Sequence, residues 1–148
     1  MTDDEYRYAE KVLYSYRRDN EKVSTLAAEL EILREAGDVR VQSYNVSGGN
    51  VQGISDPVAR HVEKVMSLER RLKRVLRRVK AVDVMREDLQ NDRVITITSK
   101  RNLLLILDGY YIPCVTAREF LSAVRWSRSV FYVRRRELVM IAGEYLRA

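Results

Sequence analysis

The residues with the clearest potential for chemistry lie close together near the C-terminus. Residues 126 to 146 read WSRSVFYVRRRELVMIAGEYL, which combines arginines with serines and tyrosines. An arginine can donate two hydrogen bonds to guanine or hold a phosphate. Serine hydroxyls and free N–H groups at a helix start also suit a phosphate. The candidate DNA contacts are Ser127, Arg128, Ser129, Tyr132, Arg135 and Arg136.

Helical spacing predicts that most of these side chains share one face. Ser127 can cap a helix that runs toward Leu146, and the arginines and the tyrosine then follow from Arg128 at steps of four, three and one residues. We expect the opposite face to pack inward through Phe131, Leu138, Ala142 and Tyr145, helped by Val130 and Ile141. The helix would thus expose one basic stripe.

A second, shorter helix precedes this one. Thr116 is a suitable N-cap, and Glu119 three residues later completes a capping box. The helix would span 117 to about 124, and a turn of about three residues would lead to Ser127. An earlier helix would begin after Ser99 and end at Asp108-Gly109. This order is the layout of a helix-turn-helix.

The N-terminal part predicts two long helices. Residues 3 to 36 carry apolar side chains at alternating steps of three and four, which Asn20 interrupts. We expect this helix to end at Gly37, a flexible Gly/Ser-rich loop over 38–55, and a second helix from Asp56-Pro57 to about Gln90. The apolar positions of this second helix are flanked by Val58, Val62, Met66 and Leu76.

The sequence therefore predicts an all-α fold. A long antiparallel helical hairpin over 1–91, able to form a coiled coil or an oligomer, would be followed by a small helix-turn-helix domain over 92–148. Residues 91 to 98 (NDRVITIT) are rich in β-branched side chains, and we interpret them as an extended connector or irregular helix.

Charge is unevenly distributed along the chain. Residues 1 to 38 hold 10 acidic and 6 basic side chains, whereas residues 56 to 80 hold 9 basic and 3 acidic ones. The basic face of 70–80 could pair with the acidic first helix or contact a polyanion. Residues 112 to 148 are also basic, with 7 basic and 3 acidic side chains.

Enzyme chemistry finds little support in the residues. His61 is the only histidine and Cys114 the only cysteine, so no conventional zinc site can be built. Gly48-Gly49 lacks the signature of a phosphate-binding loop. We expect no catalytic site, no metal and no cofactor. No apolar run approaches the ~20 residues of a membrane span, so we expect a cytoplasmic protein with no membrane partner.

The segments LLILDGYY and TAREFLSAVRWSRSVFYVRRRELVMIAGEYL resemble the promoter-reading helix-turn-helix of sigma factors. Together with Ser55 to Ala59 (SDPVA), the pattern is similar to RinA/ArpU-type regulators of late genes in phages and prophages. The chain departs from that pattern at Leu121, where a small residue is usual, and at Arg125, where glycine is usual.

The resemblance implies a transcriptional activator that binds double-stranded DNA and contacts RNA polymerase. We expect the long helices to make a homo-oligomer, with a dimer favoured. Two alternatives stay open: a phage DNA-packaging component like a small terminase subunit, and a non-catalytic coiled-coil adaptor.

Overall fold

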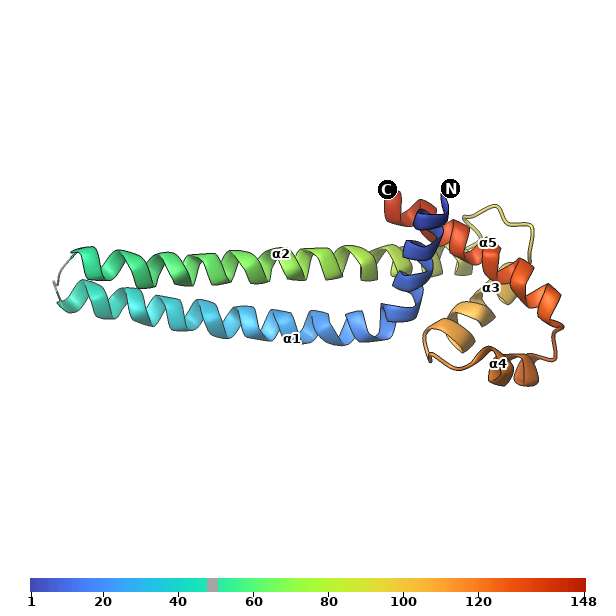
Figure 1. Cartoon of the computed structure of the whole chain (residues 1–148), viewed down its shortest axis with the longest axis horizontal. Helices are drawn as coiled ribbons and strands as arrows, with labels where there is room; N and C mark the ends of the chain where they lie inside the picture. The colour runs from blue at the N-terminus through green and yellow to red at the C-terminus, as the bar shows by residue number, and fades with distance from the viewer. Residues whose placement is uncertain (48–50) are drawn as a thin grey trace. The chain divides into compact units, whose positions relative to one another are not determined.

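The computed structural model describes the backbone of residues 1–47 and 51–148, and the side chains of 1–37 and 57–148. Over these residues the chain is all-helical, which confirms the predicted fold class. The elements are α1 (Asp3–Ser47), α2 (Val51–Gln90), α3 (Lys100–Ile106), the π-helix η1 (Leu107–Tyr111), α4 (Ala117–Val124) and α5 (Arg128–Arg147), as Figure 1 shows.

The helices form two compact units. The hairpin unit comprises residues 21–76, and the terminal unit comprises residues 1–20 and 77–148. We expected a division near residue 91, so the terminal unit is larger than predicted. The reason is that the first turns of α1 and the last turns of α2 pack with the C-terminal helices instead of with the hairpin alone.

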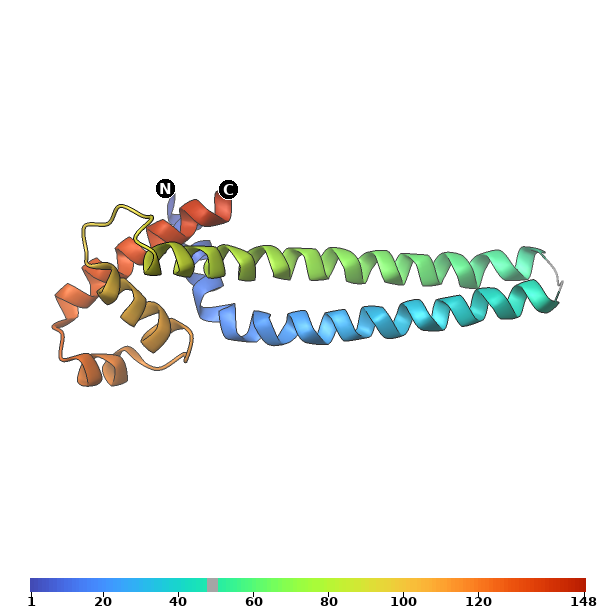
Figure 2. The same cartoon turned by 180° about the vertical axis from the view of Figure 1, so that it is seen from behind.

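In the hairpin unit, α1 and α2 lie side by side and antiparallel (Figure 1 and, from behind, Figure 2). An ion pair joins Arg34 of α1 to Glu69 of α2 at 2.6 Å. Further along, Gly37 packs so closely on the ring of His61 that a side chain at position 37 would overlap it. From the first contact to the second, the residue number rises along α1 and falls along α2, as an antiparallel hairpin requires.

The predicted loop over 38–55 is wrong in its extent. Residues 38–47 belong to α1 and residues 51–55 belong to α2, and positions 48–50 lie outside the described residues. Neither Gly37 nor Pro57 ends a helix. Gly37 serves the close contact with His61, and Pro57 lies within α2, where proline removes one backbone hydrogen bond without stopping the helix.

The terminal unit has the larger core. Its fully buried side chains come from α1, α2, α3, η1 and α5, and include Leu13, Met85, Leu89, Leu103, Ile106, Leu107, Tyr111, Phe131, Leu138 and Val139. A buried charge also lies here: Asp19 is 2% exposed and pairs with Arg78 at 3.1 Å. The polar position that we expected within this stripe was Asn20, which is exposed.

The connector between α2 and α3 is an irregular segment of turns and bends, neither helix nor strand. The carboxylate of Glu137 on α5 accepts hydrogen bonds from the N–H groups of Ile97 and Thr98, at 2.9 and 3.0 Å. Ser99 then caps α3 by accepting from the N–H of Asn102 at 3.2 Å. The connector is therefore tied to α5 just before α3 begins.

Asp108-Gly109 does not end the third helix. The chain continues through a π-helical turn, which directs Tyr110 and Tyr111 into the core. A side chain at Gly109 would stand 3.3 Å from the ring of Phe120, so this position needs a small residue for the close approach of α4. The chain stays helical past Asp108-Gly109 because the buried rings of Tyr110 and Tyr111 stabilise the π-helical turn.

Candidate nucleic-acid interface

Two capped helices with a tight turn between them form the candidate site. The hydroxyl of Thr116 accepts from the N–H of Glu119 at 3.2 Å at the start of α4. The hydroxyl of Ser127 accepts from the N–H of Val130 at 3.3 Å at the start of α5. Both predicted N-caps and the bounds of α4 are confirmed. Residues 125–127 make the turn.

Arg125 gives the turn its shape. Its backbone is left-handed, with φ 59° and ψ 35°, and its N–H donates to the carbonyl of Leu121 at 2.8 Å. This conformation favours glycine and costs another residue about 1 kcal/mol. Glycine would adopt this turn without strain, but arginine occupies the position. Leu121 is half-buried rather than fully packed at the crossing.

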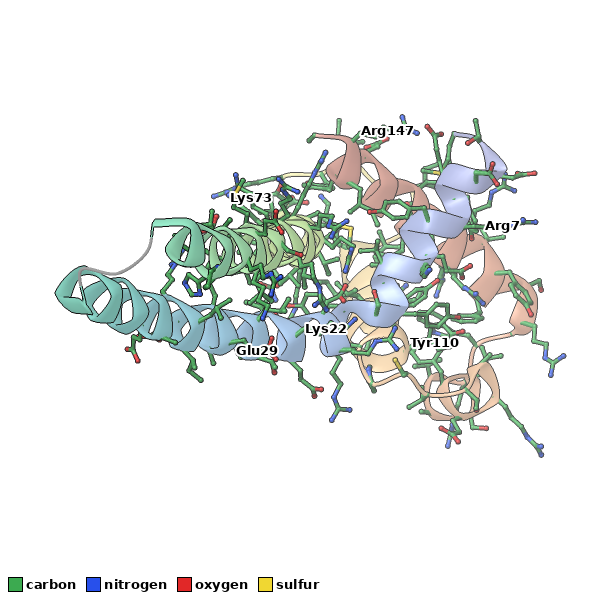
Figure 3. The ribbon with its side chains drawn as sticks, turned by 60° about the vertical axis from the view of Figure 1, so that its left-hand side comes forward. Arg7, Lys22, Glu29, Lys73, Tyr110 and Arg147 are labelled. Carbon is green, nitrogen blue, oxygen red and sulfur yellow. The ribbon has the colours of Figure 1, made fainter. Side chains whose placement is uncertain are left out.

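Aromatic side chains hold α4 against α5. The ring of Phe120 lies 5.3 Å from that of Phe131 and 5.6 Å from that of Trp126, measured between centroids. Tyr110 of η1 packs edge-on against Phe131 at 5.2 Å. Figure 3 shows Tyr110 close to α1, whose Tyr14 ring it meets edge-on. Because such rings are rigid and well packed, they fix how α5 is presented.

The N-terminal half of α5 is open to solvent on one side. Arg128, Tyr132 and Arg136 are exposed and follow each other at steps of four, so they form a continuous stripe. Ser127 and Ser129 are also exposed at the helix start, and their hydroxyls are 3.5 Å apart. We call these five residues the exposed stripe. They are five of the six predicted DNA contacts.

Arg135 is the sixth, and the structure does not place it on this stripe. Its guanidinium makes an ion pair with Glu10 of α1, and its Nε also donates to the hydroxyl of Tyr111 at 3.0 Å. A further bond reaches the Tyr14 hydroxyl at 3.1 Å. The prediction of Arg135 as an outward contact is wrong because α1 covers this side of α5.

This buried cluster has a fixed charge pattern. Burial raises the pKa of Tyr111 well above its usual range, so its hydroxyl stays protonated and donates to Glu10 at 3.1 Å. Burial alone would lower the pKa of Arg135, but its hydrogen bonds with Glu10 and Tyr111 outweigh burial and raise it. Arg135 is therefore a permanent cation with a structural partner.

The C-terminal half of α5 is anchored. Tyr145 donates to Asp88 of α2 at 2.6 Å, and Arg147 pairs with Glu5 of α1 at 3.2 Å. Burial and the bond to Asp88 raise the pKa of Tyr145 to about 12. The expected inward positions Phe131, Leu138, Ile141 and Ala142 are buried and Tyr145 is half-buried, whereas Val130 is exposed.

Sequence reasoning missed three features of this surface. Val133 is 69% exposed beside the exposed stripe. Arg134 lies 4.5 Å over the ring of Trp126, which fixes a second arginine next to the turn. Arg118 of α4 is exposed like Arg125 and adds positive charge. The α-helical period places Val133 one turn after Ser129, so the sequence did contain a signal for its exposure.

The basic face of α2 separates into two parts. Arg78 pairs with the acidic side chain of Asp19, as the pairing of an acidic and a basic helix predicts. The remaining cations of this run are exposed: Arg70, Arg71, Lys73, Arg74, Arg77 and Lys80. Pairing with α1 thus accounts for one member of the run.

Within the part of the chain that the structure describes, no group of three or more His, Cys, Asp or Glu side chains could hold a metal ion. In the same residues, no helix is both long enough and apolar enough to cross a membrane. The chain matches no protein-family model, no curated protein and no solved structure.

Proposed function

We propose that the protein is a sequence-specific DNA-binding transcriptional regulator that reads the major groove with the N-terminal half of α5. The observation that carries this proposal is the exposed stripe. It follows a tight turn and a short capped helix, while the rest of α5 is anchored to the core. In a helix-turn-helix, this half of the second helix enters the groove.

Each side chain of the stripe has a role in this proposal. Arg128 and Arg136 stand two helical turns apart and can each donate two hydrogen bonds to a guanine edge. Ser129 and the backbone N–H groups at the start of α5 can contact a phosphate. Tyr132, 57% exposed between the two arginines, contacts the bases or sugar between them. Arg118 and Arg125 add phosphate contacts.

The resemblance to sigma-like late-gene regulators supports a more specific role. We propose an activator of phage or prophage late genes, acting in the cytoplasm of a bacterial host with contacts to RNA polymerase. The protein would act as a dimer, because two copies can read two half-sites of one operator. Catalysis, metals and cofactors have no part in this proposal.

The test begins with selection of bound fragments from random double-stranded DNA. Arg128→Ala and Arg136→Ala should each weaken binding to the selected site by about 1–3 kcal/mol. The matched control is Arg18→Ala, which removes an exposed arginine from α1 of the same unit and should leave binding unchanged.

Two results would refute the proposal. One is the recovery of no common site, together with no DNA binding at physiological salt, as a coiled-coil adaptor predicts. The other is equal binding by wild-type protein and the Arg128→Ala/Arg136→Ala double variant. Binding through phosphates should also weaken steeply as salt rises.

A further inference from the structure

The hairpin unit buries few side chains. Among its described residues, Leu26, Leu30 and Val75 are the buried hydrophobic ones. Val65, Leu68 and other apolar positions along the contact are half-buried. Two helices share a single contact surface, so apolar residues that lie beside this surface stay open to water. A bundle of four helices would cover them.

One side of the hairpin unit carries apolar side chains around the Arg34–Glu69 ion pair. Ala27 precedes Arg34 by seven residues, and Val62 and Leu76 lie seven residues before and after Glu69. Seven residues make almost two helical turns, so all three lie on the side marked by the Arg34–Glu69 ion pair. Met66, three residues before Glu69, completes the set. We call Ala27, Val62, Met66 and Leu76 the apolar flank.

The apolar flank is exposed, and its residues on α2 border the stripe that packs against α1. Val62 is 48% exposed, Met66 45% and Leu76 42%, and Ala27 is exposed beside them. Large apolar side chains that gather on one surface mark an interaction site more often than single exposed ones do. Three of its four residues extend along α2 from Val62 to Leu76 and one, Ala27, lies on α1, so the occupant that fits it is elongated and helical.

The other side of α2 has a different composition. Arg60, Lys64, Arg71 and Arg74 follow each other at steps of four, seven and three, which places them on the opposite flank. All four are exposed. The hairpin unit therefore has one apolar and one basic flank, and a single apolar surface suits a pair of subunits better than a ring.

Charge identifies the occupant. In the hairpin unit, residues 21–37 of α1 hold four acidic and two basic side chains, while residues 57–76 of α2 hold six basic and two acidic ones. At the rim of the flank, Glu31 of α1 and Lys73 of α2 are exposed, and Figure 3 shows Lys73 pointing away from its helix. A second copy of the hairpin offers both the apolar surface and the opposite charges.

We infer that the apolar flank is the dimer interface, occupied by the same flank of a second copy. A two-fold axis along the hairpin places the acidic α1 of one copy over the basic α2 of the other. An axis across the hairpin would place α2 over α2, with excess positive charge on both sides. The first arrangement gives a four-helix bundle in which each acidic helix has two basic neighbours.

This inference names the surface of the dimer that the proposed function uses, and it rests on that dimer but not on DNA binding. The test measures mass, so its failure is distinct from a failure to bind DNA. The apolar flank contains none of the residues of the basic flank or of the exposed stripe. A variant that no longer dimerises should still contact one half-site, with weaker overall affinity.

The experiment determines the mass of the full chain by light scattering and analytical ultracentrifugation. The wild-type protein should be a dimer. Val62→Glu/Leu76→Glu should raise its dissociation constant on the order of 100-fold, because the charges would be buried without partners. The matched control is Ile32→Glu: Ile32 is 66% exposed but points away from the flank, two residues from Arg34, so this variant should stay dimeric.

A milder variant guards against unfolding of the double mutant. Met66→Gln adds no charge and suits a helix, and it should raise the dissociation constant on the order of 10-fold with unchanged helix content by circular dichroism. A monomeric wild-type protein, a closed ring of many subunits, or variants that all dimerise like wild type would overturn the inference. A stable complex with another helical protein in place of a dimer would also overturn it.

Discussion

Replacing Glu10 with glutamine should lower the free energy of unfolding of the terminal unit by about 2 kcal/mol. The Glu10 carboxylate accepts from the Arg135 guanidinium and from the hydroxyl of Tyr111, 3.1 Å away. The charged side chains of Glu10 and Arg135 are only 20% and 18% exposed. Loss of one partner from a fully buried ion pair costs about 3–5 kcal/mol, and partial exposure reduces this cost.

A double-mutant cycle isolates the interaction. Arg135→Met removes the guanidinium but keeps an unbranched chain, so Glu10→Gln should cost less than about 0.5 kcal/mol in its background. The coupling energy between the two positions would then be about 1.5 kcal/mol. Urea unfolding followed by far-UV circular dichroism measures each step. Glu29→Gln, at an exposed position of α1, is the matched control and should change stability little.

Two outcomes would refute this reasoning. Equal costs of Glu10→Gln in both backgrounds would show that the two side chains do not interact in solution. Loss of specific DNA binding by Arg135→Met with unchanged stability would return Arg135 to the reading surface, as its spacing along α5 first suggested.

Three further changes test other parts of the account. Arg125→Gly should raise the free energy of unfolding by about 1 kcal/mol, since glycine adopts the left-handed turn without strain; thermal unfolding measures it. Asp19→Asn should lower the free energy of unfolding by about 2 kcal/mol, because Arg78 loses its buried partner. Urea unfolding measures this change. Finally, the pKa of Tyr111 is higher in the folded protein than in the unfolded chain, where it is near 10. The resulting contribution to the free energy of unfolding is fully present below about pH 10 and declines as pH rises above that value. Tyr111→Phe should reduce that alkaline decline by about 1.4 kcal/mol per pH unit.

Local signals in the sequence were sufficient for much of the candidate site. Ser99, Thr116 and Ser127 each accept from a backbone N–H three residues ahead, and this contact depends on almost nothing outside one helical turn. The bounds of α4 and the start of α5 follow from these caps. The exposure of Arg128 and Tyr132 follows from helical period.

Long-range contacts decided what the sequence could not. Arg135 shares the spacing of an outward residue, but its partner Glu10 is separated from it by 125 positions. Helical period cannot distinguish a side chain that faces water from one that faces another helix carrying a complementary charge. Asp19 shows the same difficulty: the charge pattern indicated that the basic face of 70–80 could pair with the acidic first helix, but not that Arg78 would be the partner of Asp19.

Gly37 illustrates a different difficulty. A glycine followed by aspartate is a helix-ending signal, yet α1 continues to Ser47 because the missing side chain makes room for His61 of the facing helix. In the same way, a Cβ atom at position 109 would stand 3.3 Å from the ring of Phe120, so Gly109 leaves room for that ring. A single sequence does not reveal whether a glycine serves backbone conformation or close packing.

The most direct test of DNA reading by α5 replaces guanines of the selected site, one at a time, with 7-deazaguanine. This base lacks the N7 acceptor in the major groove and keeps Watson–Crick pairing. We predict that wild-type binding weakens at specific guanines, and that the loss at each one is absent in either Arg128→Ala or Arg136→Ala. Wild-type binding that no substitution weakens, or variants that respond like wild type at every guanine, would contradict it.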